Sequence, residues 1–351
     1  MKNFFINGKK IDNGFRPYII AEMSGNHNQS FEHGLNIIES ASKINASAVK
    51  LQTYTAETLT IDSDKKDFVI DDHKLWKNYN LFQLYKKAYT NWDWIKEYII
   101  YAKKLNIDCF SSVFDESSID FMESLDVSAY KIASFENNHI PLIKMAARTK
   151  KPLIISTGLA SEEEIDEAVA VARENNCEQL ALLKCTSDYP ADPKDSNLLS
   201  IPYLKQKYGC QVGLSDHTLG IGASLASIAL GGTIIEKHFT TTRTIETVDS
   251  KFSADSNEFA LLIKEANLIA KSLGKITFGY SLNEKKSINF RRSIYAIENI
   301  KKGDLFSKKN IRIIRPGYGV HPRYFEKLIG KKSPKEFLYG DRLDNSVLNI
   351  L

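Results

Sequence analysis

Two histidines, His217 and His238, each follow a short apolar run, and a helical stretch separates the two runs. Residues 213–218 read GLSDHT, and residues 236–239 read EKHF. Consecutive strands of a parallel barrel would direct both imidazoles into one mouth. Neutral imidazole binds Mn²⁺, Zn²⁺ and similar ions, and two protein ligands leave positions for water and substrate. The spacing therefore indicates a metal site suited to Lewis-acid chemistry and water activation.

A second set of polar residues is typical of a site for a small, multiply charged anion. Lysines, serine hydroxyls and backbone N–H groups at helix N-termini hold phosphate and carboxylate groups in proteins. Residues of these types at the ends of apolar runs include Lys50, Lys131, Ser134, Ser156 and Ser215. Taken singly they have structural explanations, since Lys50 could pair with a glutamate and Ser156 could cap the next helix. Together with the two histidines they favour a catalytic mouth.

The elements that must position these residues are short apolar runs that alternate with helical patterns. The runs cover 18–23, 48–53, 108–113, 129–134, 152–157, 180–185, 211–216 and 233–239. Continuous apolar runs between helices are typical of parallel strands that are buried on both faces. Eight of them predict a (β/α)8 TIM barrel, a fold that carries catalysis at the C-terminal ends of its strands. Among the helices, Ser161 and Glu164 form a capping-box pattern at the start of 161–176.

The remaining segments predict an N-terminal cap, an insertion and a small second domain. The insertion, 54–91, carries Trp76, Tyr79, Phe82 and Tyr85; it could be a lid, a substrate wall or a structural excursion. From Arg291 the pattern changes to short β-type runs and Lys-Lys-Gly turns, and so short a module is expected to have little core of its own. The predicted boundaries are 1–16 for a hairpin cap, 17–275 for the barrel, 276–290 for a polar linker and 291–351 for the second domain.

Composition excludes several classes of function. The chain has 351 residues, 43% of them hydrophobic, and a net charge of +4, which favours a globular enzyme over a nucleic-acid binder. The four cysteines form no CxxC pair, so buried reduced thiols are expected rather than a disulfide framework. We find no signal-peptide pattern and no apolar run of about 18 residues, the length of a membrane span. These features predict a cytoplasmic protein without a membrane partner.

Eleven short motifs, in this order, resemble the sialic acid synthase family, and their wording is nearest to its pseudaminic acid branch. They are AEMSGNHN (21–28), KLQTYTAETLT (50–60), LYKKAYT (84–90), YKIASFE (130–136), STG (156–158), LLKCTSDYPA (182–191), GLSDHT (213–218), EKHF (236–239), DSKFS (249–253), RRSIY (291–295) and IRPGYG (314–319). The resemblance implies a barrel followed by a C-terminal antifreeze-like (SAF) domain. It also implies condensation of phosphoenolpyruvate with an open-chain acylated amino sugar, here 2,4-diacetamido-2,4,6-trideoxy-L-altrose.

The resemblance also implies roles for individual residues. His217 and His238 would bind a divalent ion (Mn²⁺, Mg²⁺ or Co²⁺), and Glu22 and Asp249 would orient the sugar or move protons. Arg315 would reach into the barrel mouth of the other subunit of a domain-swapped homodimer. The implied substrate contacts are Lys50, Gln52, Ser112 (with Ser111 as its alternative), Lys131, Ser134, Glu136, Ser156, Ser187, Tyr189 and Ser215.

Two other functions remain open from the sequence. One is a neuraminic or legionaminic acid synthase with the same chemistry and a different sugar. The other is a sugar-binding protein without catalysis, because antifreeze-like modules bind sugars or ice-like surfaces elsewhere. The lysine and histidine set argues against the second.

Overall fold

The computed structural model describes residues 3–70 and 79–351. It divides into two compact units, Met1–Gly274 and Lys275–Leu351. Trp76, one of the aromatic residues of the insertion, lies outside the described residues.

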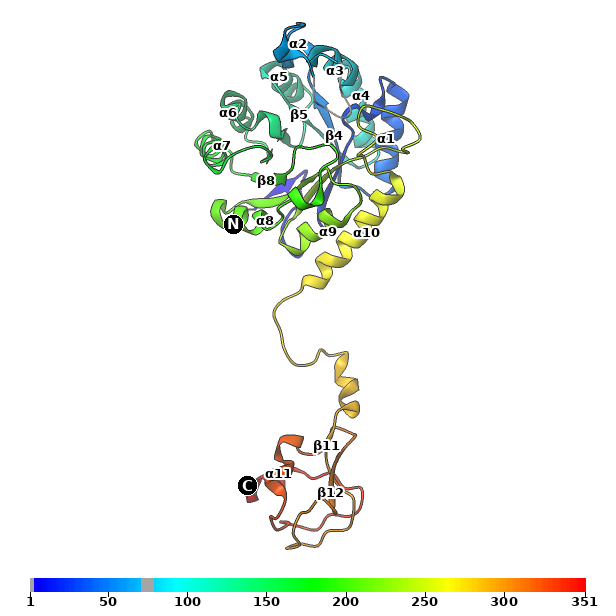
Figure 1. Cartoon of the computed structure of the whole chain (residues 1–351), viewed down its shortest axis with the longest axis vertical. Coiled ribbons are helices and arrows are strands. Elements are labelled where there is room, and N and C mark those ends of the chain that lie inside the picture. Colours follow the sequence, from blue (N-terminus) through cyan, green and yellow to red (C-terminus); the bar gives the residue numbers. More distant parts are fainter. Residues whose placement is uncertain (1–2, 71–78) are drawn as a thin grey trace. The chain divides into compact units, whose positions relative to one another are not determined.

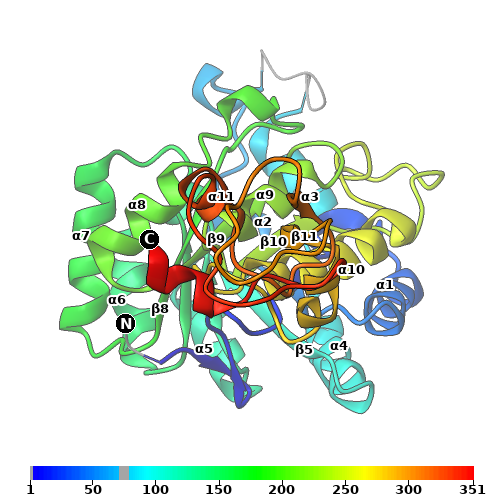
Figure 2. The ribbon, with the colours of Figure 1, turned by 90° about the horizontal axis from the view of Figure 1, so that it is seen from below.

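The first unit is a closed barrel of parallel strands in the order β10-β3-β4-β5-β6-β7-β8-β9. This confirms the predicted (β/α)8 architecture, and the helices form a ring outside the strands (Figures 1 and 2). The strands are buried almost throughout, which explains their continuous apolar sequences. Their bounds are β3 Tyr18–Glu22, β4 Ala48–Thr53, β5 Asp108–Val113, β6 Tyr130–Ile132, β7 Leu153–Ser156, β8 Leu180–Cys185, β9 Gln211–Asp216 and β10 Ile234–His238.

Local sequence signals mark the start of helix α7 and the end of helix α10. The predicted capping box is present in helix α7, because Ser161 N donates to Glu164 Oε2 at 2.7 Å and Glu164 N donates to Ser161 Oγ at 3.2 Å. Helix α10 ends at Gly274, which has a positive φ of 51°. The bounds are α1 Phe31–Lys43, α4 Trp92–Lys104, α5 Glu116–Ser124, α6 Ile140–Arg148, α7 Glu162–Glu174, α8 Ser200–Tyr208, α9 Gly222–Ala229 and α10 Ser256–Leu273, with 3-10 turns η1 Ser24–His27, η3 Ser134–Glu136 and η4 Pro193–Asp195 between strands and helices.

A small hairpin, β1 Phe5–Ile6 with β2 Lys9–Lys10, covers the starts of the barrel strands. Asp108, the first residue of β5, anchors it. The Asp108 carboxylate accepts hydrogen bonds from Asn7 Nδ2 at 2.9 Å, Lys9 Nζ at 2.9 Å and Tyr18 Oη at 2.7 Å. The hairpin is thereby tied to the N-terminal end of the barrel, opposite the expected catalytic mouth.

The insertion between β4 and α4 contains α2 Ala56–Leu59, η2 Lys66–Phe68 and α3 Leu81–Ala88. Two of its aromatic residues, Tyr54 and Tyr85, pack at the C-terminal end of the barrel. The ring of Tyr54, which follows β4, lies 5.9 Å from that of Tyr85 and 5.1 Å from that of Phe114, which follows β5. The insertion therefore borders the mouth, while its role as a lid or substrate wall stays a prediction.

The second unit has a hydrophobic core of its own, and the expectation of little core was wrong. Strands β11 Ser293–Ala296 and β12 Ile311–Ile314 pair antiparallel, and the unit also holds η5 Glu284–Phe290, η6 Pro322–Tyr324, α11 Phe325–Leu328 and η7 Asn345–Ile350. Apolar residues that are far apart in the sequence form this core, and half of the ten lie in loops. They are Ile294, Ala296, Ile300, Phe306, Ile311, Val320, Leu328, Phe337, Leu343 and Val347.

Candidate active site

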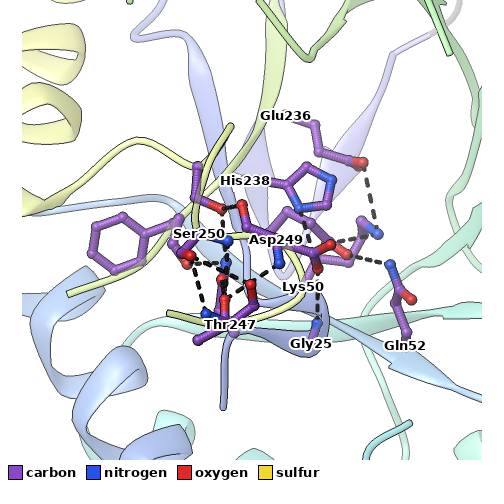
Figure 3. A network of polar contacts seen from close by, with 12 residues as sticks. Gly25, Lys50, Gln52, Glu236, His238, Thr247, Asp249 and Ser250 are labelled. Atoms are coloured by element: carbon purple, nitrogen blue, oxygen red, sulfur yellow. Dashed lines mark hydrogen bonds and ion pairs between the residues drawn. The ribbon is translucent and has the colours of Figure 1, made fainter. Parts of the chain in front are cut away.

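Lys50 forms the centre of a charged cluster inside the barrel mouth (Figure 3). Its Nζ lies 2.7 Å from Glu22 Oε2, 2.7 Å from Ser112 Oγ and 3.6 Å from Glu236 Oε1. Gln52 Nε2 donates to Glu22 Oε1 at 2.8 Å. Because β3, β4, β5 and β10 are neighbours in the barrel, residues far apart in the sequence meet at one amine. Four predicted site residues are thus brought together, and Lys50 does pair with a glutamate.

Sequence reasoning assigns no role to Glu236, although the structure places it in this cluster. It lies two residues before His238 in β10, and side chains two apart in a strand share a face. Ser215 Oγ on β9 donates to its Oε1 at 3.5 Å. The EKHF motif and strand alternation could have identified it. If His238 faces the mouth, Glu236 must face the mouth as well.

The two buried carboxyl groups beside Lys50 differ in protonation. Burial raises the pKa of Glu22 to about 7, with the negative charge of Glu236 adding to this shift and Lys50 opposing it. Burial would also raise the pKa of Glu236, but Lys131 and Lys50 outweigh it and hold that pKa below its usual value. Glu236 is therefore a carboxylate at neutral pH, while Glu22 can both give and accept a proton.

A second polar cluster surrounds Lys131, the middle residue of β6. Lys131 Nζ donates to Ser156 Oγ at 2.6 Å and to the Ile132 carbonyl at 2.9 Å. Burial lowers the pKa of this lysine. Its amine and the neighbouring hydroxyl are the donors that a carboxylate or phosphate requires.

Gly158 extends this cluster with a backbone donor. Its N–H donates to Ser134 Oγ at 3.1 Å. A Cβ at this position would lie 2.6 Å from Ser134 Oγ and 2.4 Å from Ser187 Oγ. The two predicted serines therefore converge on a backbone that only glycine leaves open, as in many anion sites.

The structure separates Ser111 from Ser112, which the sequence left as alternatives. Ser112 Oγ accepts the hydrogen bond from Lys50. Ser111 Oγ instead lies 2.7 Å from Thr53 Oγ1, whose hydroxyl also contacts the sulfur of Met122 on the surrounding helix α5. Ser112 therefore belongs to the mouth, and Ser111 belongs to the contact between the barrel and its helices.

Glu136, the last residue of η3, is a third carboxyl group with an altered pKa. Burial raises its pKa to about 7, and Lys131 and Lys50 only partly oppose the shift. Its Oε2 is buried and has no hydrogen-bond partner. The charge of Glu136 also contributes to a raised pKa of Tyr85 in α3, behind the larger effect of burial. This carboxyl group therefore lies between the lysine clusters and the insertion.

His217 and His238 lie side by side, with ring centroids 5.4 Å apart. Two aromatic rings border the pair. Tyr189, a predicted substrate contact, lies 4.3 Å from the His217 ring, and Phe252 lies 4.9 Å from the His238 ring. The predicted convergence of the two imidazoles is therefore present, in an aromatic and buried corner of the mouth.

The two histidines fit a divalent cation by their hydrogen bonding. His217 Nδ1 donates to the Thr186 carbonyl at 2.8 Å, which leaves Nε2 with its lone pair, as in many metal-bound histidines. His238 Nδ1 is buried without a hydrogen-bond partner. Burial and the nearby His217 hold the pKa of His238 well below its usual value, so the ring is neutral. Among residues 3–70 and 79–351 no group of three or more His, Cys, Asp or Glu could hold a metal, so water or substrate must complete the coordination.

Asp249 is held beside His238 by the loop that follows β3 (Figure 3). Asp249 Oδ2 accepts from Gly25 N at 3.1 Å and lies 3.9 Å from His238 Nδ1. Thr247 Oγ1 donates to Asn26 Oδ1 at 2.5 Å and accepts from Asp249 N at 3.3 Å. Burial raises the pKa of Asp249. The AEMSGNHN motif therefore acts as a frame for the carboxyl group as well as a source of Glu22.

Cys185, expected to be a core thiol, lies against His217 with Sγ 3.8 Å from Nδ1. The four cysteines are buried and free, as predicted. Burial would raise the pKa of Cys185, but His217 outweighs it and brings that pKa to about 7. Burial likewise would lower the pKa of His217, and Cys185 and the Thr186 carbonyl reverse the shift. Strand periodicity alone could not reveal this contact, because it depends on how the side chain at the end of β8 packs against the one that follows β9.

Arg315 lies in the second unit, directly after β12, and its side chain is exposed. The predicted contact with the barrel mouth of another subunit stays a prediction.

Comparison with known proteins places this site in a family. A model described as "NeuB family" matches residues 37–277. The chain belongs to the NeuB family. A SAF domain model matches residues 291–341, in the second unit.

Two curated members of the NeuB family illustrate the range of relatives. The pseudaminic acid synthase of Campylobacter jejuni is 42% identical over 331 residues, covering 94% of this chain and 96% of the relative. An N,N'-diacetyllegionaminic acid synthase of the same species is 35% identical over 330 residues, covering 92% and 97%. A crystal structure of N-acetylneuraminic acid synthetase from Leptospira borgpetersenii superimposes with a TM-score of 0.73 at 31% identity, covering 83% of this chain and 96% of that one.

Proposed function

We propose that this member of the NeuB family is a pseudaminic acid synthase. It condenses phosphoenolpyruvate with open-chain 2,4-diacetamido-2,4,6-trideoxy-L-altrose and releases phosphate. The observation that carries the proposal is the paired lysine clusters in one buried mouth, each with a serine hydroxyl within 2.7 Å of its amine. The higher identity to a pseudaminic acid synthase than to a legionaminic acid synthase supports this choice of sugar.

The lysines and serines bind the anionic substrate. Lys131 with Ser156, and Lys50 with Ser112, offer charged and neutral donors to the carboxylate and phosphate of phosphoenolpyruvate. The N–H of Gly158 lies beside them. Fixed donors in a buried site stabilise developing negative charge without reorganisation, so the same groups serve the substrate and the departing phosphate.

The bond changes follow from the two substrates. C3 of phosphoenolpyruvate attacks the aldehyde carbon of the sugar, and water adds to the cation that forms at C2. The C–O bond to the phosphate group then breaks, and the bridging oxygen leaves with the phosphate. The product is a nine-carbon 2-keto acid, which closes to a ring.

The carboxyl groups orient the sugar and move protons. Glu22, with a pKa of about 7 and a hydrogen bond from Gln52, can hold a sugar hydroxyl or transfer a proton near neutral pH. Asp249 lies next to His238 and can orient the incoming water. A divalent cation, Mn²⁺, Mg²⁺ or Co²⁺, held by His217 and His238 would supply Lewis-acid polarisation of the aldehyde oxygen.

We also propose a homodimeric assembly and a cytoplasmic location. Arg315 completes the mouth of a second subunit in a domain-swapped homodimer. Four buried free thiols suit a reducing compartment, so the enzyme acts in the cytoplasm. In the described part of the chain, no helix combines the length and apolar character that a membrane crossing needs.

A panel of sugars tests the proposal. The purified full-length chain is incubated with Mn²⁺, phosphoenolpyruvate and either the L-altrose derivative, 2,4-diacetamido-2,4,6-trideoxymannose or N-acetylmannosamine, and phosphate release is measured. We expect the largest kcat/KM for the L-altrose derivative. Faster turnover of either other sugar would make the chain a legionaminic or neuraminic acid synthase. If no phosphate were released with any of the three sugars, the proposed synthase activity would be rejected.

A further inference from the structure

An ion pair on the outer wall of the barrel joins the two strands that carry the histidines. Lys237 Nζ lies 3.1 Å from Asp216 Oδ2, and both side chains are 1% exposed. The two residues are partners in the register of β9 and β10. Asp216 directly precedes His217, and Lys237 directly precedes His238. A contact between these two residues therefore links the backbone positions of the two histidines.

The pair lies in a layer that is otherwise apolar. Successive side chains of a strand point to opposite faces, so Asp216 and Lys237 face away from the mouth and toward helix α9. Ser224 Oγ of that helix donates to Asp216 Oδ2 at 2.6 Å. The residues of the same orientation two positions earlier, Leu214 and Ile235, are buried and apolar, as is usual between a barrel strand and its helix. The Lys–Asp pair departs from this rule directly beside the histidines.

The same contacts hold the backbone on both sides of His217. Asp216 Oδ1 accepts from Thr218 N at 2.9 Å and from Thr218 Oγ1 at 2.8 Å. Lys237 Nζ donates to the Thr218 carbonyl at 2.6 Å. The residue before His238 thus contacts the residue before and the residue after His217. With Nδ1 of His217 bonded to the Thr186 carbonyl, both its backbone and its ring are fixed.

Stability gives little reason for such a pair. Removing two charges from water costs several kcal/mol per ion, and apolar replacements of similar volume are often neutral or stabilising. Residues behind metal ligands, by contrast, set the orientation of those ligands and change metal affinity when they are altered. We propose that Lys237 and Asp216 are positioning residues that hold His217 and His238 at the separation a divalent cation requires. This inference rests on the metal site of the proposed function.

The test measures Mn²⁺ binding to the full-length protein without substrates. The variants are Lys237→Met, Asp216→Asn and the double variant, with isothermal titration calorimetry for Kd and the electron paramagnetic resonance spectrum of the bound ion as a second readout. Each single variant leaves one buried charge unpaired, so it should lose both stability and Mn²⁺ affinity. The double variant leaves neither charge, so its stability should recover toward that of the wild type. Its Kd should stay about 10–100-fold weaker, with an altered spectrum of the bound ion.

The matched control is the Lys9→Met/Asp108→Asn double variant, which removes the Lys–Asp pair at the opposite end of the barrel. It should bind Mn²⁺ with an unchanged Kd and spectrum. Wild-type affinity in the Lys237→Met/Asp216→Asn variant would overturn the positioning role, as would an equal loss of affinity in the control. If the wild type itself bound no Mn²⁺, the metal site of the proposed function would fail and the positioning role with it.

Discussion

Both ends of the barrel bury charged residues, but the two ends differ in how completely these residues are hydrogen-bonded. At the N-terminal end, Asp108 accepts hydrogen bonds from Asn7, Lys9 and Tyr18, and the hairpin closes over it. At the C-terminal end, four buried atoms among the described residues have no hydrogen-bond partner: Glu22 Oε2, which forms only an ion pair with Lys50, Glu136 Oε2, Glu236 Oε2 and His238 Nδ1. Ser128 Oγ, which precedes β6, is a single such atom at the start of a barrel strand. Unpaired buried polar atoms cost free energy, so their concentration at one end marks the end that awaits a ligand.

The electrostatics follow the same division. At the mouth, burial raises the pKa of Glu22 and of Glu136 to about 7. Both carboxyl groups lie near buried lysines, but the lysine charges offset only part of the pKa shift that burial causes. Titratable groups with such shifts cluster at functional sites. The N-terminal end of the barrel therefore stabilises the fold, and the C-terminal end is suited to bind anions and transfer protons.

The largest expected effect is that of Lys50→Met, which removes the amine shared by Glu22, Glu236 and Ser112. Loss of a charged donor in a buried site should lower kcat/KM by about 10²–10³-fold. Steady-state phosphate release measures it. Lys9→Met is the matched control, because Lys9 pairs with a buried carboxylate at the other end. A similar loss in both variants would mean that the two ends do not differ in function.

Glu136→Gln should remove a pH dependence of stability. The folded-state pKa of Glu136 is raised from 4.5 to about 7, so the folded state binds more protons than the unfolded state between these values. Stability therefore falls as pH rises through this window, by about 3 kcal/mol for this group. Urea unfolding should show the variant to be more stable than the wild type at pH 7.5 and equal to it near pH 4.5. Parallel pH profiles would show that Glu136 is not held protonated.

The smallest effect should come from Asp108→Asn at the N-terminal end. Loss of the charge weakens the contacts to Lys9 and Tyr18, and we expect a loss of about 1–3 kcal/mol in the free energy of unfolding. The values of kcat and KM should stay those of the wild type at temperatures where the variant is folded. A change in KM for phosphoenolpyruvate would contradict the division between the two ends.

Much of the fold was predictable, because strands that are buried on both faces have continuous apolar sequences. The runs at 180–185 and 211–216 match β8 and β9 in both bounds. The start of α7 was equally clear, because Ser161 and Glu164 act through local hydrogen bonds. The core of the second unit was less clear, since half of its apolar residues lie in loops that show no period.

Site residues were predictable where residue type and strand order indicate their role. They were not predictable where the role depends on a particular side-chain contact. The convergence of Lys50 with Glu22, and of His217 with His238, follows from the order of strands in a closed barrel. The choice of Ser112 over Ser111 depends on which face each hydroxyl takes. The contact of Cys185 with His217 depends on side-chain packing across neighbouring strands, which no sequence period encodes.

A single-turnover reaction with phosphoenolpyruvate that carries ¹⁸O in its bridging oxygen tests the central claim most directly. The enzyme is mixed with this substrate, Mn²⁺ and the L-altrose derivative, and both products are analysed by mass spectrometry. The account predicts one labelled oxygen in every phosphate released and none in the nine-carbon keto acid. Label retained in the keto acid, or no phosphate at all, would contradict condensation with C–O cleavage at this barrel mouth.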